Sequence, residues 1–354
     1  MELYYDVEAH GEMHHNPAKN VLWIARDAAD IAEQLGLAEA AVAVTIAQAK
    51  AKMLAARLTR PTPYIDRTMY VSWNAMLVSA YLEAARVLDG VVAESCRRFA
   101  LKTLERMLAE AWSESRGFAH RVGGPALDGS LDDQVFGVLA LLEAYETTLE
   151  SRYFDVAKKT MDLAIARYGD SDGGGFFDRP SDAAPMGGLD VRRKPFQDSP
   201  TPGTNSMAAI ALIRLHSFSG GEIYRLTAEK TLEAFAGIAP RYGLFAATYG
   251  LAATLFAQHP MQIVVTGLTD DWVAQSLELA AHRVFRFGKA VLRVTPGTKL
   301  AALAGALKET LPHLPADKPV AIVCTGQSCL PPATNAAQLT ALLQSGAAGA
   351  AVPA

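Results

Sequence analysis

A polar pair of residues opens a long apolar helical segment three times along this chain. The pairs are Trp73-Asn74, Asp132-Asp133 and Asn205-Ser206. After each pair come Ala- and Leu-rich sequence with helical periodicity, a very short connection and a second, more charged helical segment. The spacing is 59 residues from Asn74 to Asp133 and 72 residues from Asp133 to Asn205. The sequence therefore predicts a stack of αα-hairpins.

The pattern changes beyond Pro260, where short β-branched runs alternate with helical segments. We predict an all-α domain at 1–259, a small α/β domain with a βαβαβ arrangement at 260–345, and a flexible tail at 346–354. The expected helices are 20–36, 38–58, 70–88, 91–112, 132–149, 152–167, 204–218, 222–238, 244–257, 270–284, 298–310 and 335–344, and the expected strands are 262–266, 290–294 and 320–324.

The first helix of each predicted hairpin carries fewer charges than the second. We therefore expect the first helices to form the inner ring of a curved or closed α/α array. The N-termini of the first helices would then converge on one face, together with the long loops between hairpins. Each N-terminus adds roughly half a positive charge and free N–H donors. A polyhydroxylated or anionic small molecule would suit such a concave face.

Composition excludes some classes of protein. The net charge is −4, the pI is about 6.1, and no basic stretch is dense enough to follow a phosphate backbone, which argues against nucleic acid as a partner. The start of the chain lacks a basic leader and an apolar segment, and no run of 18 uncharged apolar residues occurs, so we expect a cytoplasmic protein without a membrane anchor. Three cysteines are too few for a disulfide framework.

Two clusters contain residue types that bind metals, but neither has the spacing of a known metal site. His10, His14 and His15 lack the carboxylate or cysteine spacing that would complete a known ligand set. Cys324 and Cys329 are separated by four residues, which is neither the redox Cys-x-x-Cys pattern nor half of a zinc knuckle. A redox or metal role for these two cysteines stays open, and no motif predicts a cofactor.

Four segments carry a family resemblance, in the same order over about 270 residues. They are Pro63–Asn74, Leu131–Thr148, Asp198–Ser206 and Val323–Pro332. They resemble segments of the thioredoxin-domain-containing proteins whose C-terminal part is a six-hairpin, glycosidase-like toroid. The resemblance implies an (α/α) toroid with glycoside hydrolase or sugar epimerase relatives.

The chain also departs from that family pattern. The N-terminal thioredoxin-like domain and the first helical stretch have no counterpart, so the toroid would be incomplete, with about nine helices rather than twelve. Of the family's Asp-Asp-Lys run only Asp66 is present, because Arg67 and Thr68 replace the other two residues. A basic neighbour would favour ionised Asp66, whereas a general acid needs a raised pKa.

The candidate catalytic residues are carboxylates. One of Asp132 and Asp133 could act as acid and the other as base on a glycosidic or hydroxyl centre. Adjacent residues on a helix point about 100° apart, so the working partner could instead be Asp66 or Asp198 from another repeat. The alternative is that two acids simply favour the positive end of the helix dipole.

The candidate ligand-binding residues include a tryptophan and two asparagines at helix starts. Trp73 and Asn74 could stack on and hydrogen-bond a sugar, or Ser72 could cap the helix beside a buried Trp73. Asn205 follows a Pro-Gly turn, where a helix N-terminus can bind an anion or a hydroxyl. Ordinary turn and cap chemistry explains Asn205 equally well.

Three loop residues complete the candidate set. Phe118 and Phe176 could stack on a sugar ring, or they could anchor their loops. His120 could serve as an acid or base in an epimerase-like site, or it could be a solvated loop histidine.

Two function classes remain. The first is a carbohydrate-active enzyme that uses the carboxylates of the concave face. The second is a non-catalytic helical module that binds a sugar-like ligand or another protein, either a separately encoded thioredoxin-like domain or a second copy of this chain.

Overall fold

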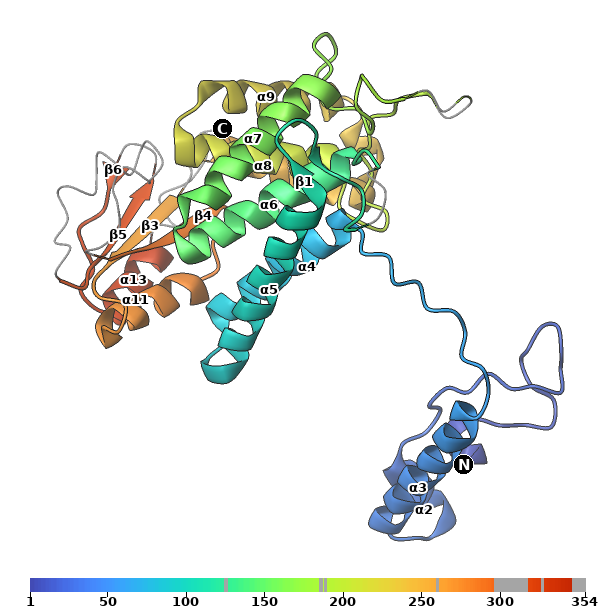
Figure 1. The fold of residues 1–354 in the computed structure, drawn as a ribbon. Coiled ribbons are helices and arrows are strands. Elements are labelled where there is room, and N and C mark those ends of the chain that lie inside the picture. The colour runs from blue at the N-terminus through green and yellow to red at the C-terminus, as the bar shows by residue number, and fades with distance from the viewer. Residues whose placement is uncertain are drawn as a thin grey trace. The chain divides into compact units, whose positions relative to one another are not determined.

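A computed structural model describes residues 1–123, 127–184, 187, 190–258, 261–295, 318–325 and 328–345. The chain forms two compact units, Met1–Arg67 and Thr68–Ala354, which are described separately (Figure 1). The domain boundary predicted at His259-Pro260, the predicted helix 298–310 and the predicted tail 346–354 lie outside the described residues.

The N-terminal unit is built around a small helical core. It contains α1 (Glu2–Tyr5), α2 (Ala28–Leu35) and α3 (Glu39–Leu58), with Tyr4, Ile31, Ala32 and Val42 buried between them. The helix predicted at 20–36 begins late, because the Asp27 side chain accepts a hydrogen bond from the Asp30 N–H and so caps the helix at Ala28.

The three predicted αα-hairpins are confirmed in the C-terminal unit to within about two residues. Two short 3₁₀ turns and a further helix follow them. The elements are α4 (Val71–Val87) with α5 (Gly90–Ala111), α6 (Leu131–Thr148) with α7 (Ser151–Tyr168), α8 (Thr204–Ser219) with α9 (Glu222–Ala236), η2 (Ala239–Arg241), η3 (Gly243–Ala246) and α10 (Ala247–Ala257).

The first helices of the second and third hairpins are the inner ones. In α6, 14 of 18 residues are buried, against seven of 18 in its partner α7. The same holds for α8, with ten buried residues of 16 against five of 15 in α9. Because α6 contacts both α4 and α8, it forms the centre of the helical core. The expected inner position of the less charged helices is confirmed for these two hairpins.

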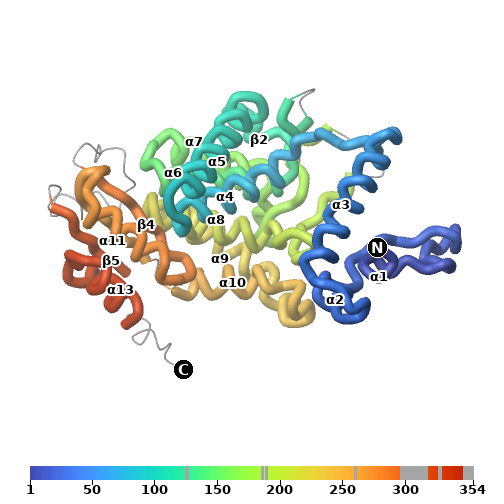
Figure 2. Tube along the Cα trace, turned by 90° about the horizontal axis from the view of Figure 1, so that it is seen from below, coloured from blue at the N-terminus to red at the C-terminus, as the bar shows by residue number. Residues whose placement is uncertain are grey.

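A four-stranded sheet lies at one end of the hairpins (Figures 1 and 2). Its strands are β4 (Lys289–Val294), β3 (Met261–Thr266), β5 (Ala321–Thr325) and β6 (Ser328–Cys329), in that order. α11 (Trp272–Arg283) connects the parallel strands β3 and β4, whereas β5 is antiparallel to β3. The predicted βαβαβ arrangement is therefore correct for its first βαβ unit and wrong for its last strand, which makes the sheet mixed.

The sheet is a layer between two sets of helices. Ile263 and Val265 of β3 face α11 and α13 (Ala336–Ser345), while Val264 between them belongs to the core of the hairpins. This alternation is the period of two that a strand imposes on its side chains. The sheet consequently shares its core with the helical array.

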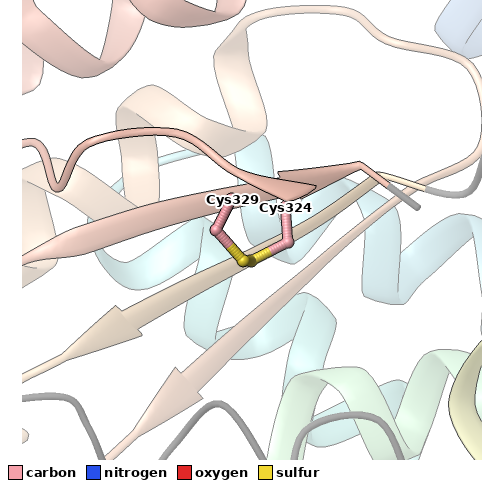
Figure 3. The surroundings of a disulfide bond; sticks show 2 residues. All are labelled: Cys324 and Cys329. Atoms are coloured by element: carbon pink, nitrogen blue, oxygen red, sulfur yellow. A yellow bond between two sulfur atoms is a disulfide. The ribbon is translucent and has the colours of Figure 1, made fainter. Parts of the chain in front are cut away.

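Cys324 and Cys329 form a disulfide across β5 and β6, with their Cα atoms 4.0 Å apart (Figure 3). The sequence analysis, which found three cysteines too few for a disulfide framework, missed this pairing. The spacing fits no named motif, but the antiparallel pairing of β5 with β6 places the two residues directly opposite each other. Cys96 is a free, partly buried thiol.

Two strands of two residues each form a further antiparallel pair, β1 (Trp112–Ser113) with β2 (Gly117–Phe118). Within the described residues, none of the helices is both long enough and apolar enough to cross a membrane.

Candidate functional site

The N-termini of three first helices meet at the start of α6. Asp133 Oδ1 accepts a hydrogen bond from the backbone N–H of Ser72 in the first turn of α4, at 3.0 Å. Asp132 Oδ1 accepts one from the hydroxyl of Thr204, the first residue of α8. Two adjacent carboxylates thus bind the α6 N-terminus to both neighbouring helices. The expected convergence of the first-helix N-termini is confirmed.

Asp133 is fully buried and occupied by structural hydrogen bonds. Its Oδ2 accepts from the N–H of Ser130 at 2.8 Å and from the Ser130 hydroxyl at 2.9 Å, which closes a capping box at the start of α6. The same oxygen lies 2.8 Å from Nδ1 of His120. Asp133 therefore orients His120, and it has no exposed surface with which to contact a ligand.

His120 is the partly exposed member of this cluster. Its side chain is 39% exposed, and its backbone carbonyl accepts a hydrogen bond from the N–H of Val71 at the start of α4. The hydrogen bond that His120 donates to Asp133 raises the pKa of His120, and the charges of Asp133 and Asp132 raise it further against an opposing effect of burial. With Nδ1 held by Asp133, Nε2 is the atom left for proton exchange.

Asp132 is half-buried beside this pair. Burial raises the pKa of Asp132, and the charges of Asp133 and Asp178 act in the same direction, while Thr204 and His120 oppose them. Its carboxyl thus keeps its proton to a higher pH than an ordinary aspartate. The site brings together a carboxyl and an imidazole that both hold protons more tightly than usual, which is suited to acid–base chemistry.

The Tyr70 ring links His120 to Trp73. The Tyr70 ring lies 5.1 Å from the His120 ring and 5.1 Å from the Trp73 ring, and Trp73 is 63% exposed. The alternative with a buried Trp73 behind an N-capping Ser72 is wrong, because Tyr70 is the capping residue of α4. Asn74 turns back on its own helix, where its amide donates to the Tyr70 carbonyl at 2.8 Å.

Two side-chain amides hydrogen-bond in the same way to two loops, which contain Gly117-Phe118 and Gly175-Phe176 and which we call the Gly-Phe loops. Gln134 accepts from the Phe118 N–H at 2.8 Å and donates to the Phe118 carbonyl at 2.6 Å. Asn205 accepts from the Phe176 N–H at 2.7 Å and donates to the Phe176 carbonyl at 2.9 Å. The sequence repeat aligns Asn205 with Asp133. In the structure, the residue that does the same work as Asn205 is Gln134, one position further along the chain.

These hydrogen bonds show that the ligand-binding role expected for three residues is wrong. Phe118 and Phe176 are each 1% exposed and Asn205 is fully buried, so these side chains anchor their loops and face no ligand. The glycines before both phenylalanines have positive φ, 72° at Gly117 and 71° at Gly175. A Cβ at Gly117 would also lie 2.3 Å from the Gln134 amide oxygen, so a glycine is required there.

The remaining candidate carboxylates are Asp198 and Asp66. Asp198 accepts hydrogen bonds from the backbone N–H groups of Gly203 at 2.6 Å and Thr248 at 2.8 Å, and so ties the loop before α8 to α10 rather than pairing with the α6 aspartates. Asp66 belongs to the N-terminal unit, and its partnership with the α6 pair stays a prediction.

Sequence reasoning missed Tyr70, Thr204 and Asp178 as members of this cluster. Thr204 stands directly before Asn205, so its place at the start of α8 was a usable signal. Tyr70 and Asp178 come from loop positions that no periodicity marks. No group of three or more His, Cys, Asp or Glu residues in the described ranges is arranged to hold a metal ion.

Comparison with known proteins gives a relationship over most of the chain. Spermatogenesis-associated protein 20 from Homo sapiens is 30% identical over 335 residues, which are 92% of this chain and 42% of that protein. The Mus musculus protein of the same name is 28% identical over 351 residues, 95% of this chain and 43% of that protein. The chain is a distant homologue of spermatogenesis-associated protein 20. It spans less than half the length of these relatives, and no protein-family model matches it.

Solved structures similar to this homologue of spermatogenesis-associated protein 20 include two carbohydrate-active enzymes. A GH76 alpha-mannanase from Bacteroides thetaiotaomicron has a TM-score of 0.42 and 14% identity, covering 63% of this chain and 58% of that chain. Cellobiose 2-epimerase from Bacillus thermoamylovorans has a TM-score of 0.41 and 12% identity, covering 62% of each chain.

Proposed function

We propose that the cluster at the start of α6 is an acid–base site for a carbohydrate ligand, of the glycoside hydrolase or sugar epimerase type. The observation that carries the proposal is the arrangement of Asp132 and His120 around the buried carboxylate of Asp133. Within this proposal the hairpins form part of an (α/α) toroid. The Cys324–Cys329 disulfide weighs against the cytoplasmic location expected from the sequence, because the cytoplasm is reducing.

The three residues take different roles. Asp132, whose pKa is raised, donates a proton to a departing or developing oxygen. His120 accepts a proton at Nε2 from water or from a carbon next to a carbonyl, and Asp133 stabilises the resulting imidazolium through Nδ1. Asp133 is a positioning residue, because its buried carboxylate acts only through His120 and the two helix starts.

Trp73 supplies the affinity for a sugar. An indole that is 63% exposed and packs on Tyr70, the ring that also contacts His120, offers a flat apolar surface at the edge of the cluster. The C–H face of a pyranose packs on such a ring, and burying an aromatic side chain of this size is worth about 1.5–3 kcal/mol. Tyr70 holds Trp73 and His120 in place by contacting both rings.

The test is a product assay on the full chain with cellobiose and α-1,6-linked mannobiose. Hydrolysis yields monosaccharides and epimerisation yields an isomeric disaccharide, and chromatography separates the two. We expect Asp132→Asn and His120→Gln each to lower kcat by about 100-fold or more. Asp162→Asn removes a carboxylate of α7 outside the cluster and is the matched control with unchanged turnover.

Two outcomes would redirect the proposal. Full turnover by both Asp132→Asn and His120→Gln would remove the acid–base assignment. Sugar binding that disappears in Trp73→Ala, without turnover by the wild-type chain, would instead support the alternative of a non-catalytic module for a sugar-like ligand. A thioredoxin-like partner belongs to that alternative, and co-elution of the chain with a thioredoxin-like domain is its test.

A further inference from the structure

A cavity of about 490 Å³ lies at the opposite end of the hairpins, between the C-terminal halves of α4, α6 and α8 and the segment from α11 to β4. It shares no residue with the acid–base cluster. Asp133 and Glu146 are thirteen positions apart on α6, which corresponds to about 20 Å along a helix. This cavity is therefore a separate candidate site.

Two arginines and two glutamates form the polar part of the cavity wall, and we call Arg86, Glu143, Glu146 and Arg214 the Arg–Glu tetrad. Arg214 donates to Glu143 at 2.6 Å and to Glu146 at 2.6 Å. Arg86 pairs with Glu143 and lies 3.8 Å from Glu146. The side chains of Arg86 and Glu146 are only 9% and 4% exposed. The tetrad balances its own formal charges.

Buried charged groups must be compensated by partners, because removing ions from water costs several kcal/mol for each ion. Burial raises the pKa of both glutamates, but Arg214 and Arg86 outweigh it at Glu143 and lower that pKa to about 2. At Glu146 burial and the charge of Glu143 prevail, so the pKa is raised. The tetrad is therefore a buried ion-pair network that fixes the polar wall of the cavity.

The wall formed by α11 and β4 adds positive charge that the tetrad does not balance. Lys289 donates to the carbonyls of Ala281 and His282 at 2.5 and 3.0 Å, and Arg286 donates to the Leu343 carbonyl at 3.1 Å. Among the described residues no carboxylate lies within ion-pair distance of either cation. Arg286 uses only Nε and Nη2 in that contact, which leaves Nη1 for a ligand.

The total charge of the lining favours an anion. Five basic side chains and three acidic ones line the cavity. Burial lowers the pKa of the remaining titratable group, His282, to about 3, so its imidazole is neutral at physiological pH. The rest of the wall is largely apolar and includes Ile210, Ile213, Phe218, Leu255 and Phe287. A ligand that matches both parts has one anionic group and an apolar body.

We propose that this cavity binds a small amphipathic carboxylate, with its carboxylate on Arg286 and its chain against the apolar wall. Arg286 matches a carboxylate because a guanidinium presents paired N–H donors in one plane. The volume lies within the 300–1,000 Å³ that small-molecule sites generally occupy. This site is independent of the proposed acid–base function.

Isothermal titration of the full chain with octanoate tests the proposal, with octanol and inorganic phosphate as comparison ligands. We expect octanoate to bind at least about ten-fold more tightly than either comparison ligand, because octanol lacks the charge that strengthens a hydrogen bond to Arg286 and phosphate lacks the apolar chain. Equal binding of octanol would remove the anionic requirement. Equal binding of phosphate would remove the apolar requirement, and no heat with octanoate would overturn the proposal.

Substitution of Arg286 tests the assigned contact. Arg286→Gln should weaken octanoate binding at least about ten-fold. Arg225→Gln removes an exposed arginine of α9 and is the matched control with an unchanged affinity. Circular dichroism confirms that both variants are folded. An Arg286→Gln variant that is folded and binds octanoate like the wild type would overturn the assignment.

Discussion

The two ends of α6 hold acidic pairs in opposite ways. At the N-terminal end, Asp132 and Asp133 are bound by two hydroxyls, two backbone N–H groups and one imidazole. At the C-terminal end, Glu143 and Glu146 are bound by two guanidinium groups. The helix dipole favours carboxylates at the first end and opposes them at the second. Full cationic partners are therefore needed only at the C-terminal end.

This difference separates a reactive pair from a structural one. A carboxyl that is held by neutral donors beside a partly exposed imidazole can gain and lose a proton without leaving an unpaired ion behind. A carboxylate between two buried arginines cannot take up a proton in this way, because the arginines would then be buried charges without a partner. We therefore expect substitutions to reduce stability most at the C-terminal end of α6 and activity most at the N-terminal end.

The largest effect on stability should come from Arg214→Met. This change leaves Glu143 and Glu146 with one arginine between them in a buried site, and breaking such a pair costs about 3–5 kcal/mol. Arg225→Met in an exposed pair of α9 is the control and should cost less than about 1 kcal/mol. Urea unfolding followed by circular dichroism measures both. Similar losses in the two variants would contradict the contrast between the ends.

The two aspartates should differ from each other by a smaller amount. Asp133→Asn weakens the acceptor for Ser72, Ser130 and His120 and should cost about 2 kcal/mol. Asp132→Asn keeps an acceptor for Thr204 and should cost less than about 1 kcal/mol. Urea unfolding of the wild type and both variants measures the two losses of free energy. If Asp132→Asn were the more destabilising, Asp133 would lose its positioning role.

The histidine near the C-terminal end should make the fold less stable in acid. The pKa of His282 is about 3 in the folded chain and near 6.5 in an unfolded one, so the unfolded state binds the proton first. The stability that His282 contributes is present above pH 6.5 and falls by roughly 1 kcal/mol between pH 6.5 and 5.5. His282→Gln should remove this slope. Unfolding curves of wild type and variant at the two pH values measure this. A slope that persisted in His282→Gln would contradict its assignment to His282.

The histidine at the N-terminal end should act with the opposite sign. Because the pKa of His120 is raised on folding, its contribution is complete below pH 6.5 and is lost as the pH rises through the folded value. The effect should stay below about 1 kcal/mol, since solvent screens a side chain that is 39% exposed. The difference between wild type and His120→Gln, measured from pH 5 to 9, should shrink toward alkaline pH. A difference that grew with pH would refute the pairing with Asp133.

Periodicity was sufficient to predict the hairpins, because 3.6-residue patterns and short connections are local properties. The convergence of the first-helix N-termini followed from the same repeat. Three features did not follow, because they depend on contacts between distant segments. Gln134 clasps Phe118 from 16 residues away, β5 runs antiparallel to β3, and Cys329 returns opposite Cys324. The sequence places polar residues at a helix start, but only packing determines which of them is buried.

The Arg–Glu tetrad was missed for a related reason. Glu143 and Glu146 sit on an otherwise apolar helix, and Arg86 and Arg214 come from two other helices, so no local window contains the pairs. A buried acid three residues from another on an inner helix was the available signal. It points to a cation on a neighbouring helix but does not identify the residue.

The amide clasps on the Gly-Phe loops have a consequence for how such an array can change. Gln134 and Asn205 each present an N–H and a C=O to one loop residue, as an adjacent β-strand would, so each of these two loops is held by the first helix of the hairpin that follows it. Each joint between successive hairpins uses one glycine, one phenylalanine and one amide. The end of one hairpin is therefore fixed only once the next hairpin is in place.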